Sequence, residues 1–254
     1  MLMDQASTKR YDKRNAMRCI CFALFASALL VRLIKLVIDP ALMRDAALYL
    51  IMADSWYETG DYAHTLLYSY VPPFPLLTIK SLMASGIGAE AAGRTLALFF
   101  GSMTAVIAFL FVFKLCRNIR IALLAGILFV FHPDLVTYSV QPLRENIYIF
   151  FIGALLTMIV DAVHDNSAVK WGICGIPLSL AFFSRYETAE FFLIIPVIIV
   201  ILLFLKRIKL KQAFFCSVSL GLTFILTSVI VLYFVEFKSS FLLKIYYWLD
   251  RFIS

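Results

Sequence analysis

Charged residues are scarce in this sequence, and their scarcity sets the class of protein. They make up 15% of the 254 residues, against about 25% in ordinary soluble domains, which excludes a soluble globular protein. Long apolar runs recur along the chain, together with 24 Phe and 12 Tyr residues. These features exclude disordered, collagen-like and coiled-coil chains. The sequence therefore predicts an integral membrane protein.

Cysteine is also scarce, with five copies. All five fall in what we expect to be the cytoplasmic ends or halves of apolar segments, where no external disulfide forms, and their spacing matches no zinc pattern. We interpret them as small buried apolar groups. They are Cys19, Cys21, Cys116, Cys174 and Cys216.

Seven apolar runs between charged residues are candidate membrane spans, since a helix that crosses the hydrocarbon core needs roughly 20 apolar residues. The third run is interrupted by His132, Pro133 and Asp134, so a kink inside the bundle is expected there. The predicted fold class is an all-α, polytopic membrane helix bundle in a single domain over residues 1–254. The seven expected spans are 17–38, 96–113, 121–140, 147–160, 168–184, 191–205 and 213–235.

Charge asymmetry predicts the orientation. With the amino terminus in the cytoplasm, thirteen Lys and Arg residues and only four Asp residues fall on the inner side, as the positive-inside rule requires. Residues 1–16 are then a cytoplasmic tail, 39–95 a long extracytoplasmic loop and 236–254 an extracytoplasmic tail. The net charge of +7 is interpreted as this topology signal, with attraction to anionic membrane lipids, and not as nucleic-acid binding. The absence of an Asn-x-Ser/Thr sequon fits a bacterial plasma membrane.

The expected extracytoplasmic loop is too long to lack structure of its own. Residues 44–59 contain no Gly or Pro and predict a helix that ends at Gly60. On that helix one carboxylate, Asp45, shares the apolar and aromatic face with Tyr49. A second short helix is predicted over 76–85. Candidates for stacking on sugar faces, or for an interfacial aromatic belt, are Tyr62, Tyr68 and Tyr70.

Ionisable residues in the outer half of the membrane are the most informative, because a charge at the centre of a spanning helix costs about 2.5–3.5 kcal/mol. In the expected topology three clusters face outward, where a bundle can gather them round one cavity. Each has a structural alternative, as a solvated helix start, the start of a span or a break between spans. Arg32, near the outer end of the first span, is expected instead to snorkel to the interface. The clusters are Arg44 with Asp45, Arg144 with Glu145, and Arg185 with Glu187 and Glu190.

Arginine and carboxylate side chains at an outer cavity suit one kind of chemistry. The planar guanidinium fork binds phosphate through two hydrogen bonds, and a cavity that faces the membrane offers the phosphate of a lipid. A nearby carboxylate can act as general base toward an acceptor hydroxyl. Together they favour transfer of a group from a lipid phosphate to an external acceptor.

Five short motifs follow one another along residues 17–235. They are Arg44-Asp45 with Tyr49, Pro72-Pro73-Phe74-Pro75-Leu76-Leu77, Ala92-Gly93-Arg94, Pro142-Leu143-Arg144-Glu145 and Ser184-Arg185-Tyr186-Glu187. No single motif is specific. The ordered set resembles the GT-C superfamily of glycosyltransferases, in particular the branch of dolichyl-phosphate-mannose protein mannosyltransferases and bacterial aminoarabinose transferases.

The resemblance implies a multi-pass enzyme that transfers a sugar, with inversion, from a polyprenyl-phosphate donor to a glycan, lipid or protein acceptor at the extracytoplasmic face. Asp45 matches the loop acid that serves as catalytic base. Many members have two acids in this loop motif, whereas this chain has Arg-Asp-Ala, so neither a metal nor another cofactor is expected. The residues expected to bind the donor phosphate or sugar, or to orient the groups that do, are Arg44, Tyr49, Arg144, Glu145, Arg185 and Glu187.

Two other hypotheses stay open at this point. Members of the superfamily usually continue with further spans, while this chain ends nineteen residues after its last expected span. A non-catalytic subunit that binds a lipid phosphate and docks a second membrane protein would also fit. A transporter is a third hypothesis, although the sequence shows no paired internal repeat. The sugar and the acceptor are not predicted, because loops that no motif resolves build specificity pockets.

Overall fold

The computed structural model describes residues 2–60 and 71–235, with side chains from residue 15 onward. This part of the chain is α-helical, with one 3₁₀ helix and no strand, which confirms the predicted fold class. The elements are α1 (Leu2–Ile38), α2 (Arg44–Thr59), α4 (Pro73–Met83), α5 (Ala89–Cys116), α6 (Ile119–Phe131), α7 (Pro133–Ser139), α8 (Arg144–Asp165), α9 (Ala168–Phe182), η1 (Tyr186–Glu190), α10 (Phe191–Phe204) and α11 (Leu210–Phe234).

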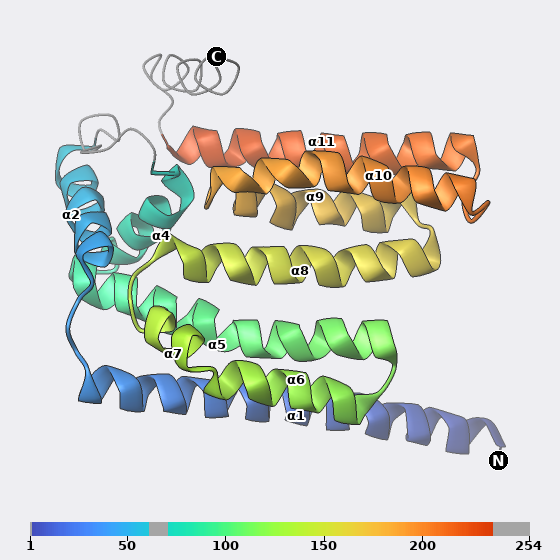
Figure 1. The fold of residues 1–254 in the computed structure, drawn as a ribbon, viewed down its shortest axis with the longest axis horizontal. Helices are drawn as coiled ribbons and strands as arrows, with labels where there is room; N and C mark the ends of the chain where they lie inside the picture. The colour runs from blue at the N-terminus through green and yellow to red at the C-terminus, as the bar shows by residue number, and fades with distance from the viewer. Residues whose placement is uncertain (1, 61–70, 236–254) are drawn as a thin grey trace.

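The long helices lie side by side in a bundle (Figure 1). Helix α5 packs against α1, α6 and α8, and α8 continues the row to α9, which packs against α11. At one end of the bundle, here called the α2 end, α2 and α4 cross the ends of the long helices (Figure 1). The amino terminus and the turns α5–α6, α8–α9 and α10–α11 lie at the opposite end.

Five helical segments are long and apolar enough to cross a membrane. They are Asn15–Ile38, Ala89–Cys116, Arg144–Asp165, Tyr186–Phe204 and Leu210–Phe234. Helices α6 and α7 together form a sixth candidate, which bends by 56°. Helix α9 is apolar but has only 15 residues, a length of about 22 Å. The expected kink in the third span is confirmed, whereas the expected count of seven spans is not.

The bend between α6 and α7 follows from Pro133. Proline has no N–H, so the carbonyl of Phe129, four residues earlier, loses its helical donor. Arg32 of α1 donates to this carbonyl, with 3.4 Å between Nη2 and O, and to the carbonyl of Ala28 at 3.1 Å. Arg32 is buried, with 1% of its surface exposed. The expectation that it snorkels to the interface is therefore wrong, because the broken helix supplies an acceptor inside the bundle.

The boundaries of the short helices show how glycine and proline act. Helix α2 has the predicted boundaries, and Gly60 follows it with a φ of 70°, a left-handed conformation that glycine adopts without steric penalty. Helix α4 begins at Pro73, three residues earlier than predicted, because the first helical turn needs no internal N–H donor. Helix α1 begins at Leu2, so it extends through the segment expected to be a tail.

Helices α2 and α4 cover the end of the bundle with their apolar faces. Trp56 of α2 and Leu76 of α4 are completely buried. They belong to one cluster with Ala92 at the start of α5, Phe183 after α9 and Val231 near the end of α11. Burial of this size stabilises the docking by about 1.5–3 kcal/mol for each large apolar side chain. The two helices are therefore fixed to the bundle, which positions the residues that they carry.

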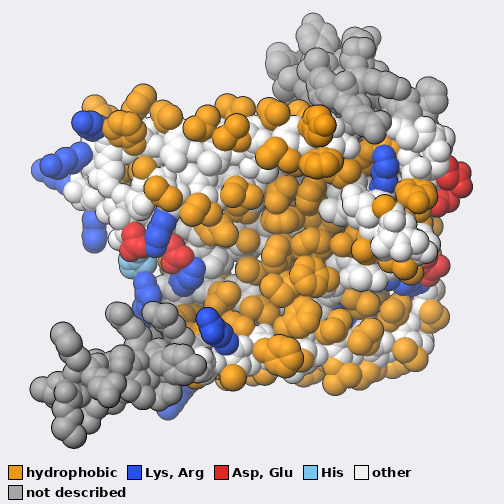
Figure 2. All heavy atoms as spheres, turned by 180° about the vertical axis from the view of Figure 1, so that it is seen from behind, with side chains coloured by type: hydrophobic (Ala, Val, Ile, Leu, Met, Phe, Trp, Pro, Cys, Tyr) orange, Lys and Arg blue, Asp and Glu red, His pale blue; other side chains and the backbone are white. Residues whose placement is uncertain are grey.

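Charge is separated along the bundle. Figure 2 shows apolar side chains over the middle of the surface and Lys and Arg side chains gathered at the end opposite α2. This arrangement matches a protein that crosses a membrane with its basic loops on one side. Which side faces the cytoplasm stays a prediction. The basic residues in or beside the turns at this end are Lys114, Arg117, Arg120, Lys170, Lys206, Arg207, Lys209 and Lys211.

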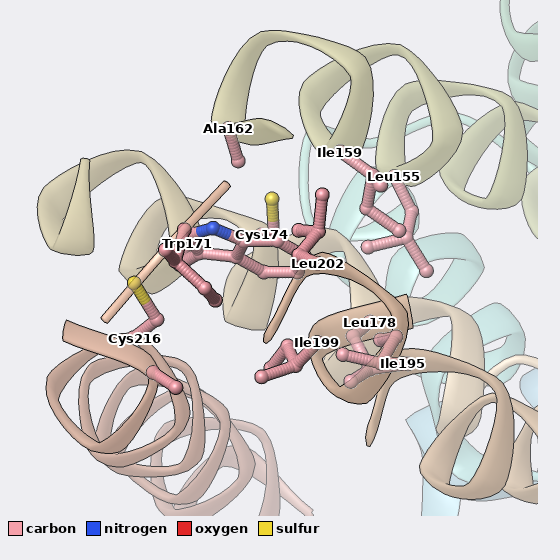
Figure 3. Close-up of a cluster of buried hydrophobic side chains, with 12 residues drawn as sticks. Leu155, Ile159, Ala162, Trp171, Cys174, Leu178, Ile195, Ile199, Leu202 and Cys216 are labelled. Carbon is pink, nitrogen blue, oxygen red and sulfur yellow. The ribbon is translucent and has the colours of Figure 1, made fainter. Parts of the chain in front are cut away.

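A second apolar cluster fills the space between α8, α9, α10 and α11 (Figure 3). Cys174 and Cys216 are buried in it. Cys19 and Cys116 are exposed, and Cys21 is partly buried. The interpretation of the cysteines as buried groups is therefore confirmed for two of them and wrong for Cys19 and Cys116, which lie on outward faces of α1 and α5.

Close contact between α9 and α11 depends on Gly175. A Cβ atom at this position would lie 2.6 Å from the carbonyl oxygen of Leu220 and 2.7 Å from the amide nitrogen of Phe224. Both are backbone atoms of α11. Thr223 of α11 also donates a hydrogen bond to the carbonyl of Gly172. Small residues thus let the two helices approach and exchange a polar contact, as is common between membrane helices.

We expect Gly175→Ala to lower the free energy of unfolding by about 1–3 kcal/mol, because backbone atoms cannot move aside as a flexible side chain can. Loss of helical circular dichroism with increasing SDS in detergent micelles measures the effect. Gly221→Ala is the matched control, since no atom lies within 4 Å of a Cβ atom there. Equal stability of the two variants would contradict the close packing of α9 and α11.

Candidate functional site

Three segments bring the predicted site residues to the α2 end of the bundle. Arg44 and Asp45 occupy the first turn of α2, and Arg144 and Glu145 the first turn of α8. Arg185 lies at the break between α9 and η1. These segments are far apart in the sequence, but α2, the start of α8 and the end of α9 lie at the same end of the bundle (Figure 1).

A cavity of about 260 Å³ lies between α2 and the start of α8. Two guanidinium groups and one carboxylate face it, so its lining has an excess of positive charge that attracts anions. Arg44 forms no ion pair or side-chain hydrogen bond with any other residue of the described ranges. The lining consists of Arg44, Asp45, Leu48, Tyr49, Met52, Val71 and Arg144.

Arg185 is outside this lining, and its charge is already compensated. Its Nε atom lies 3.2 Å from Oε1 of Glu187, and its Nη1 atom lies 3.7 Å from Oε1 of Glu145. The guanidinium also lies 5.6 Å from the ring centre of Tyr148. Glu145 Oε1 in turn lies 3.4 Å from Nε of Arg144. Glu145 therefore links Arg185 to Arg144 of the cavity lining.

Arg94 of α5 ties together the segment before α2 and the segment before α8. Its Nη2 atom donates to the carbonyl of Pro40, and its Nη1 atom donates to the carbonyl of Val140 at 3.4 Å. Its Nε atom pairs with Glu90 at 2.8 Å. Arg94 is buried, while Glu90 is exposed. One guanidinium thus joins three parts of the chain.

Gln141 makes a second tie between the same segments. Its amide oxygen accepts from the backbone N–H of Met43 at 3.0 Å, and its amide nitrogen donates to the carbonyl of Ala41 at 2.8 Å. Asn146 donates to the carbonyl of Gln141 itself at 2.9 Å. Sequence reasoning missed Gln141 and Asn146. The available signal was two uncharged amides within a mainly apolar region, beside Arg144.

Gly93 allows three segments to meet at one point. A Cβ atom there would lie 2.7 Å from Cδ2 of Leu50 on α2 and 2.7 Å from Cβ of Pro142. The glycine therefore lets α2 and the segment before α8 both contact the start of α5. This explains, in physical terms, why Gly93 stands next to Arg94 in the motif.

Within residues 2–60 and 71–235, no group of three or more His, Cys, Asp or Glu side chains is suited to a metal ion. A reaction without metal stays a prediction. The aromatic residues predicted to stack on sugars or to form a belt, and the predicted tail, lie outside the described residues. They are Tyr62, Tyr68, Tyr70 and residues 236–254.

A family model for dolichyl-phosphate-mannose-protein mannosyltransferases matches residues 72–233, more than half of the chain. A comparison with curated proteins gives no match. Helix α2, which carries Arg44, Asp45 and Tyr49, precedes the matched range. The site residues inside the range are Arg144, Glu145, Arg185 and Glu187.

Tyr49 lies in the cavity wall and is partly buried. Burial raises the pKa of Tyr49 above its ordinary value of 10.0, while two nearby arginines lower it and two nearby carboxylates raise it to smaller extents. The phenol is therefore neutral at physiological pH and can donate a hydrogen bond to an anion. We expect its titration midpoint above about 10, measured as the difference between alkaline absorbance titrations of wild type and Tyr49→Phe. A midpoint below 10 would contradict the burial.

Proposed function

The chain belongs to the dolichyl-phosphate-mannose-protein mannosyltransferase family, within the GT-C superfamily, and from this premise we propose that it transfers a sugar, with inversion, from a polyprenyl-phosphate donor to an acceptor at the extracytoplasmic membrane face. Family membership and the apolar helices identify a multi-pass membrane glycosyltransferase. The proposal adds the donor class, the stereochemical course, the side of the membrane and the residues that act.

The observation that carries this proposal is the lining of the cavity at the α2 end. Asp45, Arg44 and Arg144 face the same space. A glycosyl transfer from a lipid phosphate needs a base for the acceptor hydroxyl and positive charge for the leaving phosphate. The cavity holds both kinds of group: Arg44, which has no ion pair with another residue that the structure describes, and Arg144, which is held by Glu145.

In the proposed reaction the acceptor hydroxyl attacks the anomeric carbon of the donor from the face opposite the phosphate. Asp45 accepts the hydroxyl proton as the new carbon–oxygen bond forms. The bond between the anomeric carbon and the phosphate oxygen breaks, and its electron pair leaves with the polyprenyl phosphate. Arg44 and Arg144 stabilise this anion through charge-assisted hydrogen bonds. Tyr49, neutral in the same wall, can donate to the sugar or to the phosphate.

We propose that Arg185 does not bind the phosphate directly but holds other residues of the site in place. Two carboxylates already neutralise its charge, and one of them, Glu145, also holds Arg144. Arg185 then keeps Glu145 in place, and Glu145 orients the guanidinium of Arg144. Glu187 completes the support from η1.

We expect Asp45→Asn to lower sugar release from polyprenyl-phosphate mannose by about 10²–10⁴-fold, the usual contribution of a general base. Asparagine keeps the shape of the side chain but accepts no proton. Asp54→Asn is the matched control, because Asp54 is exposed on the same helix and is no part of the cavity lining. Thin-layer separation of labelled sugar from lipid follows turnover. Unaltered turnover in Asp45→Asn would remove Asp45 as the base.

The two cavity arginines and Arg185 are expected to behave differently. Arg44→Gln and Arg144→Gln should each weaken binding of a polyprenyl monophosphate about tenfold to hundredfold. This is the loss of affinity expected when one hydrogen bond to a charged group is removed. Arg185→Gln should weaken it less, since Arg185 acts through Glu145. Calorimetric titration in detergent measures all three. A loss in Arg185→Gln as large as that in Arg144→Gln would contradict the supporting part. Phosphate binding without sugar release in the wild type would favour a non-catalytic subunit.

A further inference from the structure

The charged residues of the cavity follow segments that have no regular structure. Helix α2 begins at Arg44 directly after the irregular residues 39–43, and α8 begins at Arg144 directly after residues 140–143. A helix start that depends on a preceding irregular segment is only as well placed as that segment. The contacts that hold these segments therefore decide where Asp45 and Arg144 lie relative to each other.

Gln141 is the side chain that contacts the chain nearest to the start of α2. Its oxygen accepts from the N–H of Met43, the residue that caps α2, and its nitrogen donates to the carbonyl of Ala41. No side chain of the helix itself caps this end. In a capping box a residue of the same helix accepts from the N–H of the capping residue. Here the acceptor comes from the segment before α8.

The burial of Gln141 makes the loss of its hydrogen bonds costly. Gln141 is 4% exposed, so the loss of either partner would leave a polar atom of its buried side chain unpaired. Gln141 itself is held from the other side, because Asn146 donates to its carbonyl oxygen. Arg94 joins the same two segments further back in the sequence from α2 and α8, at Pro40 and Val140. The residues that Gln141 joins therefore lie closer in sequence to Asp45 and Arg144 than the residues that Arg94 joins.

We propose that Gln141 is a positioning residue, which sets the placement of Asp45 and Arg44 against Arg144 by joining the start of α2 to the segment before α8. The inference rests on the proposed function for its catalytic consequence. Gln141 does not line the cavity, so it acts through α2 and not on substrate. A displacement of about 1 Å in a reacting group can lower a rate by about a hundredfold.

The decisive variant is Gln141→Met, which keeps the length of the side chain and removes both hydrogen bonds. Gln212→Met is the matched control. Gln212 also donates its side-chain amide to a backbone carbonyl, that of Asn166, but it lies at the start of α11, at the opposite end of the bundle. The two variants therefore lose the same kind of contact at opposite ends of the molecule.

Two measurements on the full chain in lipid nanodiscs test the inference. The first is the distribution of distances between spin labels at Glu58 of α2 and His164 of α8, both exposed, in a background without native cysteines. The second is the kcat and KM of sugar release from polyprenyl-phosphate mannose. We expect Gln141→Met to shift or broaden the distances, lower kcat at least about tenfold and raise KM about threefold. Gln212→Met should change none of these.

A change in the distances, kcat and KM together distinguishes a positioning role from a loss of stability. Partial loss of folded protein would lower the apparent kcat and leave KM unchanged. Unaltered distances in Gln141→Met, or altered distances with wild-type kcat and KM, would overturn the inference. A wild-type chain that releases no sugar would contradict the proposed function, and the distances alone would then decide whether Gln141 positions α2. Where Gln141→Met does not fold, Gln141→Glu keeps the acceptor for Met43, loses the donor to Ala41 and takes its place in both measurements.

Discussion

The tie between the segments before α2 and α8 is the constraint on which the site depends. Arg94 and Gln141 are both buried and together donate to or accept from backbone groups of both segments. Without these contacts the buried side chains of Arg94 and Gln141 would lose their backbone partners, and a buried polar group left unpaired costs about 1–3 kcal/mol. The same contacts that satisfy the backbone therefore also bring Asp45 and Arg144 to one cavity.

The same kind of contact, between a polar side chain and an irregular backbone segment, occurs elsewhere in this membrane protein. Backbone groups in an apolar bundle must be satisfied by other parts of the protein wherever a helix is broken. At Pro133 the donor is Arg32, which supplies the hydrogen bond that the proline cannot. Before α2 the partners are Arg94 and Gln141, and before α8 they are Arg94 and Asn146. Long polar side chains inside this bundle thus bind the irregular backbone, whereas the two arginines that line the cavity, Arg44 and Arg144, donate to no backbone group of the described residues.

Much of this arrangement could be predicted from residue type and spacing. The bounds of α2, the cap at Gly60, the kink near Pro133 and the face shared by Asp45 and Tyr49 follow from helical periodicity and from the chemistry of glycine and proline. The buried state of Arg32, the parts of Gln141 and Asn146, and the pairing of Arg185 with Glu145 could not be predicted. They depend on contacts between residues distant in sequence, which leave no periodic pattern. The early start of α4 differs from the prediction because proline, which breaks a helix in its interior, is tolerated in the first helical turn.

The central claim is that the cavity between Arg44 and Arg144 binds the phosphate of a polyprenyl lipid. An experimental structure of the protein in lipid nanodiscs with a polyprenyl monophosphate tests it most directly. We expect density for the phosphate within hydrogen-bonding distance of both guanidinium groups, with Asp45 facing the same space and Arg185 still paired with Glu145. Phosphate density on Arg185, or at the basic end of the bundle and not at the α2 end, would show that the cavity does not bind the lipid phosphate.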